Sequence, residues 1–173
     1  ICLPDGNGQF TDQSTITDGS QALFSYLWNF GDPFNNTAAV VKNPSHHYSA
    51  VGPYPVQLKL TSKDGCIDSL TQMLTTIYPQ PKAAFIASPS EACMGDTIRF
   101  TDKGNGITSN AVSWNWTLSG GDVSALQNPL KRFTDSGTFN ISYYFFNQQG
   151  CVSDTAIQQV VVDPYPKLQL PSK

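Results

Sequence analysis

The chain has 173 residues, of which 13% are charged and 12% are aromatic, and its formal net charge is −3. Its Lys and Arg residues are scattered, so the sequence lacks the basic patch that nucleic-acid-binding proteins carry. No apolar run approaches the ~18 residues that a membrane-spanning helix needs. Frequent Thr, Ser, Tyr and Phe, together with 13 Gly and 12 Pro, favour an all-β protein with many turns.

Alternation of apolar and polar residues with a period of two predicts short strands along the chain. The clearest runs are residues 26–30, 54–60, 98–100, 112–118 and 139–145. Each run would bury one face, and in the fourth run the even positions from Val112 to Leu118 face inward. Turn signals such as Asp64-Gly65 separate the runs, and no segment has a helical pattern. Short strands at this spacing, with a Trp on a central one, indicate an immunoglobulin-like β-sandwich.

The two halves of the chain repeat one another. Trp114 aligns with Trp28, and Asn128-Pro129 aligns with Asn43-Pro44. A repeat of about 85 residues is too long for a solenoid unit and right for a small domain with its own core. We therefore predict β-sandwich domains at residues 1–79 and 80–164 and a tail at residues 165–173. We also predict that Trp28 and Trp114 are equivalent and nearly fully buried, so that Trp114→Ala would cost about 3–5 kcal/mol.

Three segments of the first copy resemble the signature of the polycystic kidney disease (PKD) domain. They are Trp28-Asn29-Phe30-Gly31-Asp32, Asn43-Pro44-Ser45-His46-His47-Tyr48 and Gly52-Pro53-Tyr54-Pro55-Val56. The second copy keeps Gly137-Thr138-Phe139, but it has Thr117-Leu118 where the first has Gly31-Asp32, and Lys131 where the first has His46. The added Cys-x-Gly-Asp motif (Cys93 to Asp96) and Gly-Cys-x-x-Asp motif (Gly150 to Asp154) resemble those of PKD arrays in large surface proteins of Bacteroidetes-type bacteria. The resemblance covers nearly the whole chain and implies seven-stranded sandwiches, an extracellular location and roles in adhesion, spacing or polysaccharide contact.

Four cysteines occupy matching positions in the two copies: Cys2 with Cys93, and Cys66 with Cys151. Matched positions in a chain of this composition favour disulfides and an oxidising compartment over buried thiols. Pairing within each copy, Cys2–Cys66 and Cys93–Cys151, is the simplest arrangement. However, an immunoglobulin-like strand order puts Cys93 and Cys151 roughly 20 Å apart, beyond disulfide reach. We therefore favour a Cys2–Cys151 link between head-to-tail modules, which leaves Cys66 and Cys93 facing neighbouring modules.

The sequence offers no arrangement that predicts catalysis, a metal site or a cofactor. His46 and His47 are adjacent, and no nucleophile motif accompanies them. We interpret His46 as a residue that packs or hydrogen-bonds along an edge segment. Asp32 alone cannot supply the six or more oxygens of a calcium site, so we expect it to cap the turn after the Trp strand.

Two kinds of surface residue are candidates for contact or modification. Tyr144 and Phe146 flank an inward-facing position, so both would point outward and could contact a partner or a glycan. Ser69, Thr97 and Thr155 each follow an Asp and precede an aliphatic or Ala residue, a pattern that resembles Bacteroidetes O-glycosylation sites. Asp and Thr are also favoured at such turn-to-strand junctions, so this pattern has a structural explanation as well.

The tail begins as the second copy begins. Pro166-Lys167 matches Pro81-Lys82, which leads into the predicted first strand of the second copy, whereas the first copy has no such strand ahead of Cys2. A sandwich without this strand exposes a backbone edge that another chain can fill. We therefore expect Leu168, Gln169 and Leu170 to lie against the first module of the next unit, in a covalent array or in a filament of separate subunits.

The sequence thus predicts a non-catalytic extracellular or cell-surface module that acts as a stalk, an adhesin segment or a filament subunit and assembles head-to-tail. The alternative is a carbohydrate- or protein-binding accessory module of a larger secreted enzyme. The expected partners are identical or similar modules and, for the alternative, a polysaccharide. We expect no nucleic acid, no membrane span and no cofactor.

Overall fold

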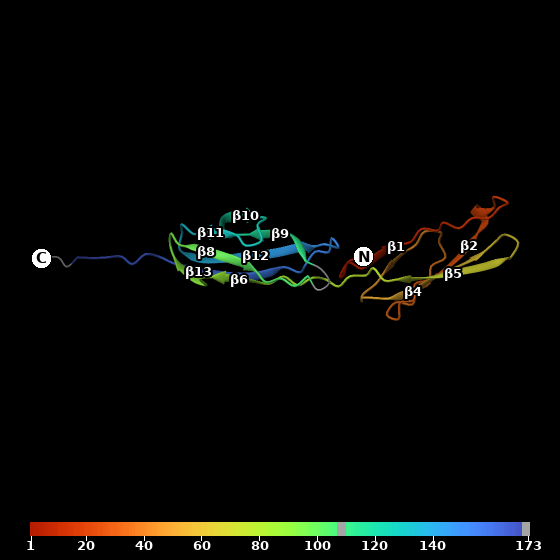
Figure 1. Ribbon diagram of the computed structural model, residues 1–173, viewed down its shortest axis with the longest axis horizontal. Helices are drawn as coiled ribbons and strands as arrows, with labels where there is room; N and C mark the ends of the chain where they lie inside the picture. The colour runs from red at the N-terminus through yellow and green to blue at the C-terminus, as the bar shows by residue number, and fades with distance from the viewer. Residues whose placement is uncertain (107–109, 171–173) are drawn as a thin grey trace. The chain divides into compact units, whose positions relative to one another are not determined.

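The computed structural model describes residues 1–106 and 110–170 (Figure 1). Residues 171–173, the end of the predicted tail, lie outside the described residues. The chain divides into two compact units, Ile1–Pro79 and Gln80–Lys173, which we call unit 1 and unit 2. Both are built from strands, and the helices of the described residues are two short 3₁₀ turns, η1 (Gln21–Leu23) and η2 (Ser119–Gly121). No helix in this part of the chain has the length and apolarity to cross a membrane.

Unit 2 is a sandwich of two sheets with the strand orders β10-β9-β12-β13-β7 and β11-β8-β6. Its strands are β6 (Phe85–Ser88), β7 (Glu91–Cys93), β8 (Thr97–Asp102), β9 (Ala111–Thr117), β10 (Val123–Ser124), β11 (Leu130–Arg132), β12 (Gly137–Asn147) and β13 (Ala156–Asp163). Neighbouring strands are antiparallel except for β7 and β13, which run parallel. The consecutive strands β6 and β7 lie in different sheets, so the edge of the sandwich crosses from one sheet to the other at the turn around Pro89.

Unit 1 repeats this arrangement with fewer strands. They are β1 (Asn7–Gln9), β2 (Ser25–Asn29), β3 (Ser45–His47), β4 (Tyr54–Thr61) and β5 (Ile67–Leu74), in sheets β2-β4-β5 and β1-β3. A parallel bridge between Cys2 and Tyr78 stands where unit 2 has β7 beside β13, and a bridge between Trp28 and Ala39 stands where unit 2 has β9 beside β10. Among the described residues of unit 1, no strand occupies the place of β6, so the β1-β3 sheet is one strand narrower.

The predicted alternation holds along most strands. Tyr54 and Val56 on β4, and Ile141, Tyr143 and Phe145 on β12, are all buried. In each unit these residues meet buried aromatic side chains of the facing strands and form a separate hydrophobic core. This two-core, all-β architecture confirms the prediction of two tandem immunoglobulin-like sandwiches.

Val112 departs from the predicted alternation. It is 52% exposed, although the pattern places it on the inner face. The pairing of β9 with β12 shifts between Phe146 and Asn147: Phe146 pairs with Ser113, and Asn147 pairs with Ala111. Val112 therefore forms a β-bulge, and the inserted residue turns it outward.

Trp116, not Trp114, is the counterpart of Trp28. The Trp28 indole Nε1 donates to the carbonyl of Val41 at 3.1 Å, and the Trp116 indole donates to that of Leu126 at 2.9 Å. Each acceptor lies three residues before the proline of its Asn-Pro dipeptide. Both indoles are buried, and each Trp pairs with the corresponding position of the central strand, β4 or β12.

The predicted equivalence of Trp114 with Trp28, and its near-complete burial, are therefore wrong. Trp114 is only partly buried, and its indole donates to the Asp102 carboxylate at 3.1 Å. A slip of two residues returns a side chain to the same face of a strand, so the alternation that we used could not distinguish Trp114 from Trp116.

Candidate functional site

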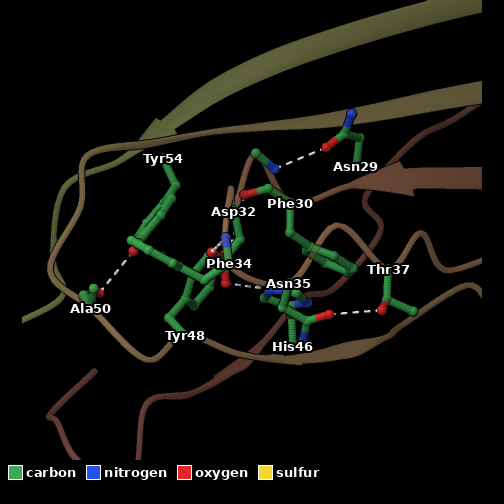
Figure 2. A network of polar contacts seen from close by, with 11 residues as sticks. Asn29, Phe30, Asp32, Phe34, Asn35, Thr37, His46, Tyr48, Ala50 and Tyr54 are labelled. Carbon is green, nitrogen blue, oxygen red and sulfur yellow. Dashed lines mark hydrogen bonds and ion pairs between the residues drawn. The ribbon is translucent and has the colours of Figure 1, made fainter.

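A buried network joins Asp32 to His46 in unit 1, as Figure 2 shows. Asp32 follows β2, and His46 is the middle residue of β3. The His46 Nε2 lies 3.2 Å from Asp32 Oδ2, and Asp32 Oδ1 accepts the backbone N–H of Phe34 at 2.9 Å. Only 2% of Asp32 and 6% of His46 are exposed. The carboxylate thus closes the turn after the Trp strand, as predicted, and also binds the imidazole.

Aromatic rings enclose this pair. The His46 ring stacks on Phe30 with centroids 4.2 Å apart and meets the edge of Tyr48 at 4.6 Å. The Tyr48 hydroxyl donates to the carbonyl of Phe30 at 3.2 Å. Burial, reinforced by the negative charge of Asp32, raises the pKa of Tyr48, so its phenol stays neutral. A His and an acid packed this tightly cannot reach a substrate, which confirms the interpretation of His46 as a packing residue.

Unit 2 has a counterpart of this acid–base pair, of which the sequence alignment identified the lysine but not the acid. Lys131 on β11 occupies the register position of His46, and its Nζ pairs with the carboxylate of Asp122. In the corrected Trp register, Asp122 comes two residues later than Asp32 does, because the turn after β9 is longer. The acid is therefore displaced rather than lost. The pair is also far more exposed than Asp32 and His46, since 60% of the Asp122 side chain is accessible.

Tyr144 and Phe146 lie together on the outer face of β12, as predicted. Each is 36% exposed, and their ring centroids are 6.0 Å apart in an edge-to-face arrangement. The cross-strand neighbours on β9 are Asn115 and Ser113, so two aromatic rings stand beside polar side chains on one surface. A pair of rings next to hydrogen-bonding groups is a surface on which a sugar ring or a partner side chain can stack.

The cysteines fall into two classes. Cys2 and Cys151 are disulfide-bonded, whereas Cys66 and Cys93 are free, exposed thiols. That Cys2 and Cys151 are linked to each other stays a prediction. The expected position of Cys66 and Cys93 beside neighbouring modules also stays a prediction.

The remaining predicted site residues are all at the surface. Ser69, Thr97 and Thr155 are exposed, so their hydroxyls are accessible to a modifying enzyme. Leu168 and Leu170 are each 95% exposed, and residues 164–170 form no strand. Figure 1 shows this tail running away from the strands of unit 2. In residues 1–106 and 110–170, no three His, Cys, Asp or Glu side chains gather closely enough to hold a metal ion.

Comparison with protein families and known proteins agrees with the architecture. A family model described as the PKD domain matches residues 5–77 and 78–162. The pre-pro-metalloprotease PrtV of Vibrio cholerae serotype O1 is 26% identical over 146 residues, which cover 84% of this chain and 15% of PrtV. Collagenase ColA of Bacillus cereus is 34% identical over 76 residues, which cover 44% of this chain and 7% of ColA. The chain therefore spans only a small part of these relatives.

Among solved structures, the PKD1 domain from the Vibrio cholerae metalloprotease PrtV is similar to this chain, with 23% identity and a TM-score of 0.43. The match covers 49% of this chain and 98% of that domain. The PKD1 domain of Vibrio anguillarum Epp is 19% identical with a TM-score of 0.44, and covers 50% of this chain and 96% of that domain.

Proposed function

Because the chain belongs to the PKD domain family, we propose that it is a non-catalytic structural module of an extracellular or cell-surface protein, of the stalk, adhesin or filament type. The observation that carries this proposal is the Asp32–His46 pair. It is the side-chain arrangement that most resembles a catalytic acid–base pair, and it is sealed inside unit 1 between aromatic rings. The Asp32 carboxylate stabilises the turn after β2 by its contacts with the Phe34 N–H and with His46, which is a structural role.

A disulfide supports the extracellular part of the proposal. Structural disulfides persist in oxidising compartments and are rare in the cytosol. Cys2 and Cys151 are disulfide-bonded. We expect peptide mapping without reduction to recover Cys2 linked to Cys151, which would join the two modules covalently. A Cys93–Cys151 peptide would instead contradict the head-to-tail link.

The tail supports assembly between copies. Leu168 and Leu170 are almost fully exposed and alternate with the polar Gln169, which gives the segment the one-faced pattern of a strand without a sheet. An extended, apolar-faced segment of this kind can add to a sheet edge of another molecule. The contact would be head-to-tail, so it would propagate as a filament unless its rotation closed a ring.

The second candidate function is that of a binding module in a larger secreted enzyme. Its support is the exposed pair Tyr144 and Phe146, together with the names of the two longer relatives, a metalloprotease and a collagenase. In this arrangement the chain would hold a polysaccharide or a protein surface near a catalytic domain elsewhere in the same polypeptide.

Two measurements on the whole chain separate these functions. Sedimentation velocity at rising protein concentration should show growing assemblies if the chain is a filament module. A glycan array should show saturable binding if it is a sugar-binding module, and Tyr144→Ala with Phe146→Ala should abolish that binding. Val161→Ala is the matched control, since Val161 is a similarly exposed apolar residue on the neighbouring strand β13 that pairs with Thr138, six residues from Tyr144. A chain that stays monomeric and binds sugar through these rings would overturn the structural proposal.

A further inference from the structure

A groove of about 520 Å³ opens into unit 1 next to the segment that follows β1, residues 10–14. Three apolar side chains, Phe10, Trp28 and Leu58, lie at its wall. Leu70 and Gln72 of β5 border it from the other side. Two of the apolar residues belong to the periphery of the core, since Phe10 and Leu58 are only partly buried. The groove therefore reaches the hydrophobic core of the unit.

In unit 2, the buried ring of Phe85 on β6 lies in the corresponding place. Its centroid is 5.1 Å from that of Trp116, 6.1 Å from that of Phe100 and 6.2 Å from that of Tyr143. All three of these residues are fully buried, unlike Phe10 and Leu58 in unit 1. Phe85 thus closes one side of the core of unit 2.

The three residues around Phe85 are the counterparts of the three apolar residues in the groove. Trp116 corresponds to Trp28, and the cross-strand partners of these two, Tyr143 and Leu58, correspond to each other. Phe100 and Phe10 each precede a Thr-Asp whose Asp backbone N–H donates to the Asn of the Asn-Pro dipeptide, at 3.0 and 2.9 Å. The groove of unit 1 therefore corresponds to the place that the Phe85 ring occupies in unit 2.

Polar groups that hold β6 in unit 2 are also repeated beside the groove. The Gln158 Nε2 donates to the carbonyl of Phe85 at 2.9 Å. Gln158 pairs with Ile141 as Gln72 pairs with Val56, so Gln72 is its counterpart. By the same register, Asp68 is the counterpart of Asp154.

Asp154 fixes the chain just ahead of β6. One of its carboxylate oxygens accepts the backbone N–H of Ala83 at 2.7 Å, and the other lies 3.1 Å from the Lys82 Nζ. An exposed acid in the same register, Asp68, is thus available in unit 1 for a lysine that enters with a strand.

We propose that the groove of unit 1 is an acceptor site for the Pro166–Leu170 segment of a second copy of this chain, with Leu170 in the place that Phe85 occupies in unit 2. The inference rests on the proposed head-to-tail assembly and identifies its contact. Pro166-Lys167 matches Pro81-Lys82, and this alignment puts Leu168 at the position of Ala83.

In this alignment Lys167, Gln169 and Leu170 of the segment each have a partner in unit 1. The Leu170 side chain enters the apolar groove, and the Gln72 amide donates to its carbonyl. Lys167 pairs with Asp68. Gln169 takes the place of Ala84, whose carbonyl accepts the backbone N–H of Lys103 at 2.8 Å in unit 2. In unit 1 the residue that matches Lys103 is Gln13, so its backbone N–H would donate to the carbonyl of Gln169. The ladder ends after Leu170, because the following proline has no N–H to donate.

A peptide titration tests the site. A fluorescent peptide of residues 163–170 is titrated into the full chain carrying Leu168→Asp and Leu170→Asp, which cannot use its own tail. We expect saturable binding, and a peptide with Leu170→Asp should bind at least about 30-fold more weakly, because a buried leucine is replaced by a charge. Equal binding of the two peptides, or no saturable binding, would overturn the inference.

Variants in the groove give the matched controls. Leu70→Asp should weaken peptide binding by at least about tenfold, whereas Ile67→Asp, on the same strand but outside the groove, should leave it unchanged. Gln72→Leu should weaken it by about 3–10-fold, the worth of one hydrogen bond. Leu70 and Ile67 are both exposed, so thermal melts should confirm that both variants fold. Equal binding to the two Asp variants would contradict the assignment of the groove.

The failure of the site and the failure of assembly are distinguishable. If the peptide binds but the wild-type chain stays monomeric in sedimentation velocity, the acceptor site stands and the head-to-tail function fails. If the chain assembles but Leu70→Asp does not reduce assembly, another surface makes the contact and the acceptor site is wrong.

Discussion

The two units share one fold, but matching core residues are more deeply buried in unit 2 than in unit 1. In unit 2, β6 lies along β8 and brings Phe85 against residues that are fully buried. In unit 1, β1 pairs with β3 on one side, and the described residues place no strand on its other side, where β8 of unit 2 has β6; the matching Phe10 and Leu58 stay partly exposed. In unit 2 the edge strand β6 therefore seals the core, whereas the described residues of unit 1 leave a groove at the corresponding place.

Other features are the same in both units and do not depend on that strand. In each, the Asn of the Asn-Pro dipeptide accepts a backbone N–H from an Asp: Asp12, after β1, in unit 1 and Asp102, at the end of β8, in unit 2.

In unit 1 this Asp also makes side-chain hydrogen bonds. Burial alone would raise the pKa of Asp12, but hydrogen bonds from Ser14 and Tyr26 hold it below its ordinary value. The motif residues therefore organise local turns, which survive whether or not the core is closed.

Replacement of Trp116 should have the largest effect. Trp116→Ala should destabilise unit 2 by about 3–5 kcal/mol, since a large buried side chain is lost. Trp114→Ala is the control and should cost only about 1–2 kcal/mol, because Trp114 is partly buried. Hydrogen exchange with mass spectrometry in rising urea reports each unit separately. Equal losses for the two variants would break the assigned correspondence between Trp116 and Trp28.

Removing the ring of Phe85 should make unit 2 resemble unit 1. Phe85→Ala should destabilise unit 2 by about 3–4 kcal/mol and speed hydrogen exchange at the Lys103 amide, which donates to the carbonyl of Ala84, the residue just before β6. Ile86→Ala, on the exposed face of the same strand, should change neither. If both substitutions act alike, Phe85 does not close the core.

The two acid–base pairs should differ in energetic worth. His46→Ala leaves the buried Asp32 Oδ2 without its side-chain hydrogen-bond partner and should cost about 3 kcal/mol. Lys131→Ala removes an ion pair whose Asp122 carboxylate is 60% exposed and so screened by water, and it should cost less than about 1 kcal/mol. Urea denaturation at neutral pH measures both. A larger cost for Lys131→Ala would reverse the comparison.

The smallest effect concerns pH. Burial opposes ionisation of Asp154, yet the Ala83 N–H and the Lys82 ammonium hold its pKa below the ordinary value of 3.8. A lowered folded-state pKa stabilises unit 2 above pH 3.8, and this stability is lost as the pH falls through the folded-state value.

The side chain of Asp154 is 38% exposed and therefore screened, so the contribution should be less than about 1 kcal/mol. Asp154→Asn should remove it. Thermal melts between pH 2 and pH 7 should show that unit 2 of the variant loses less stability on acidification than wild type does. Parallel curves would show that Asp154 does not hold the start of β6.

Patterns along a single strand predicted much of this architecture. Alternation correctly assigned the inner faces of β4 and β12 and the outward direction of Tyr144 and Phe146, because the side-chain period of a strand is fixed by its backbone. The same period hid the two-residue slip between Trp114 and Trp116, because both lie on one face.

The rest depends on contacts that sequence spacing does not encode. The displaced Asp122 becomes visible only once the hydrogen bonds of Trp28 and Trp116 set the register. The groove of unit 1 is recognised only from the contact between Phe85 and Tyr143 in unit 2, two residues that are distant in the sequence. Long-range packing of this kind needs three-dimensional placement.

The central claim is that unit 1 accepts a strand with the sequence of the tail. A direct test extends the chain at Ile1 by a second copy of residues 164–173 followed by Gly-Ser-Gly, so that Leu170 lies eight positions before Cys2, as Phe85 lies before Cys93. Hydrogen exchange of residues 11–15 is then followed in rising urea. The account predicts slower exchange and a gain of about 2 kcal/mol for unit 1, because a leucine enters the groove. A control extension with Asp at both leucine positions should change nothing. Equal exchange in the two extended chains would contradict the claim.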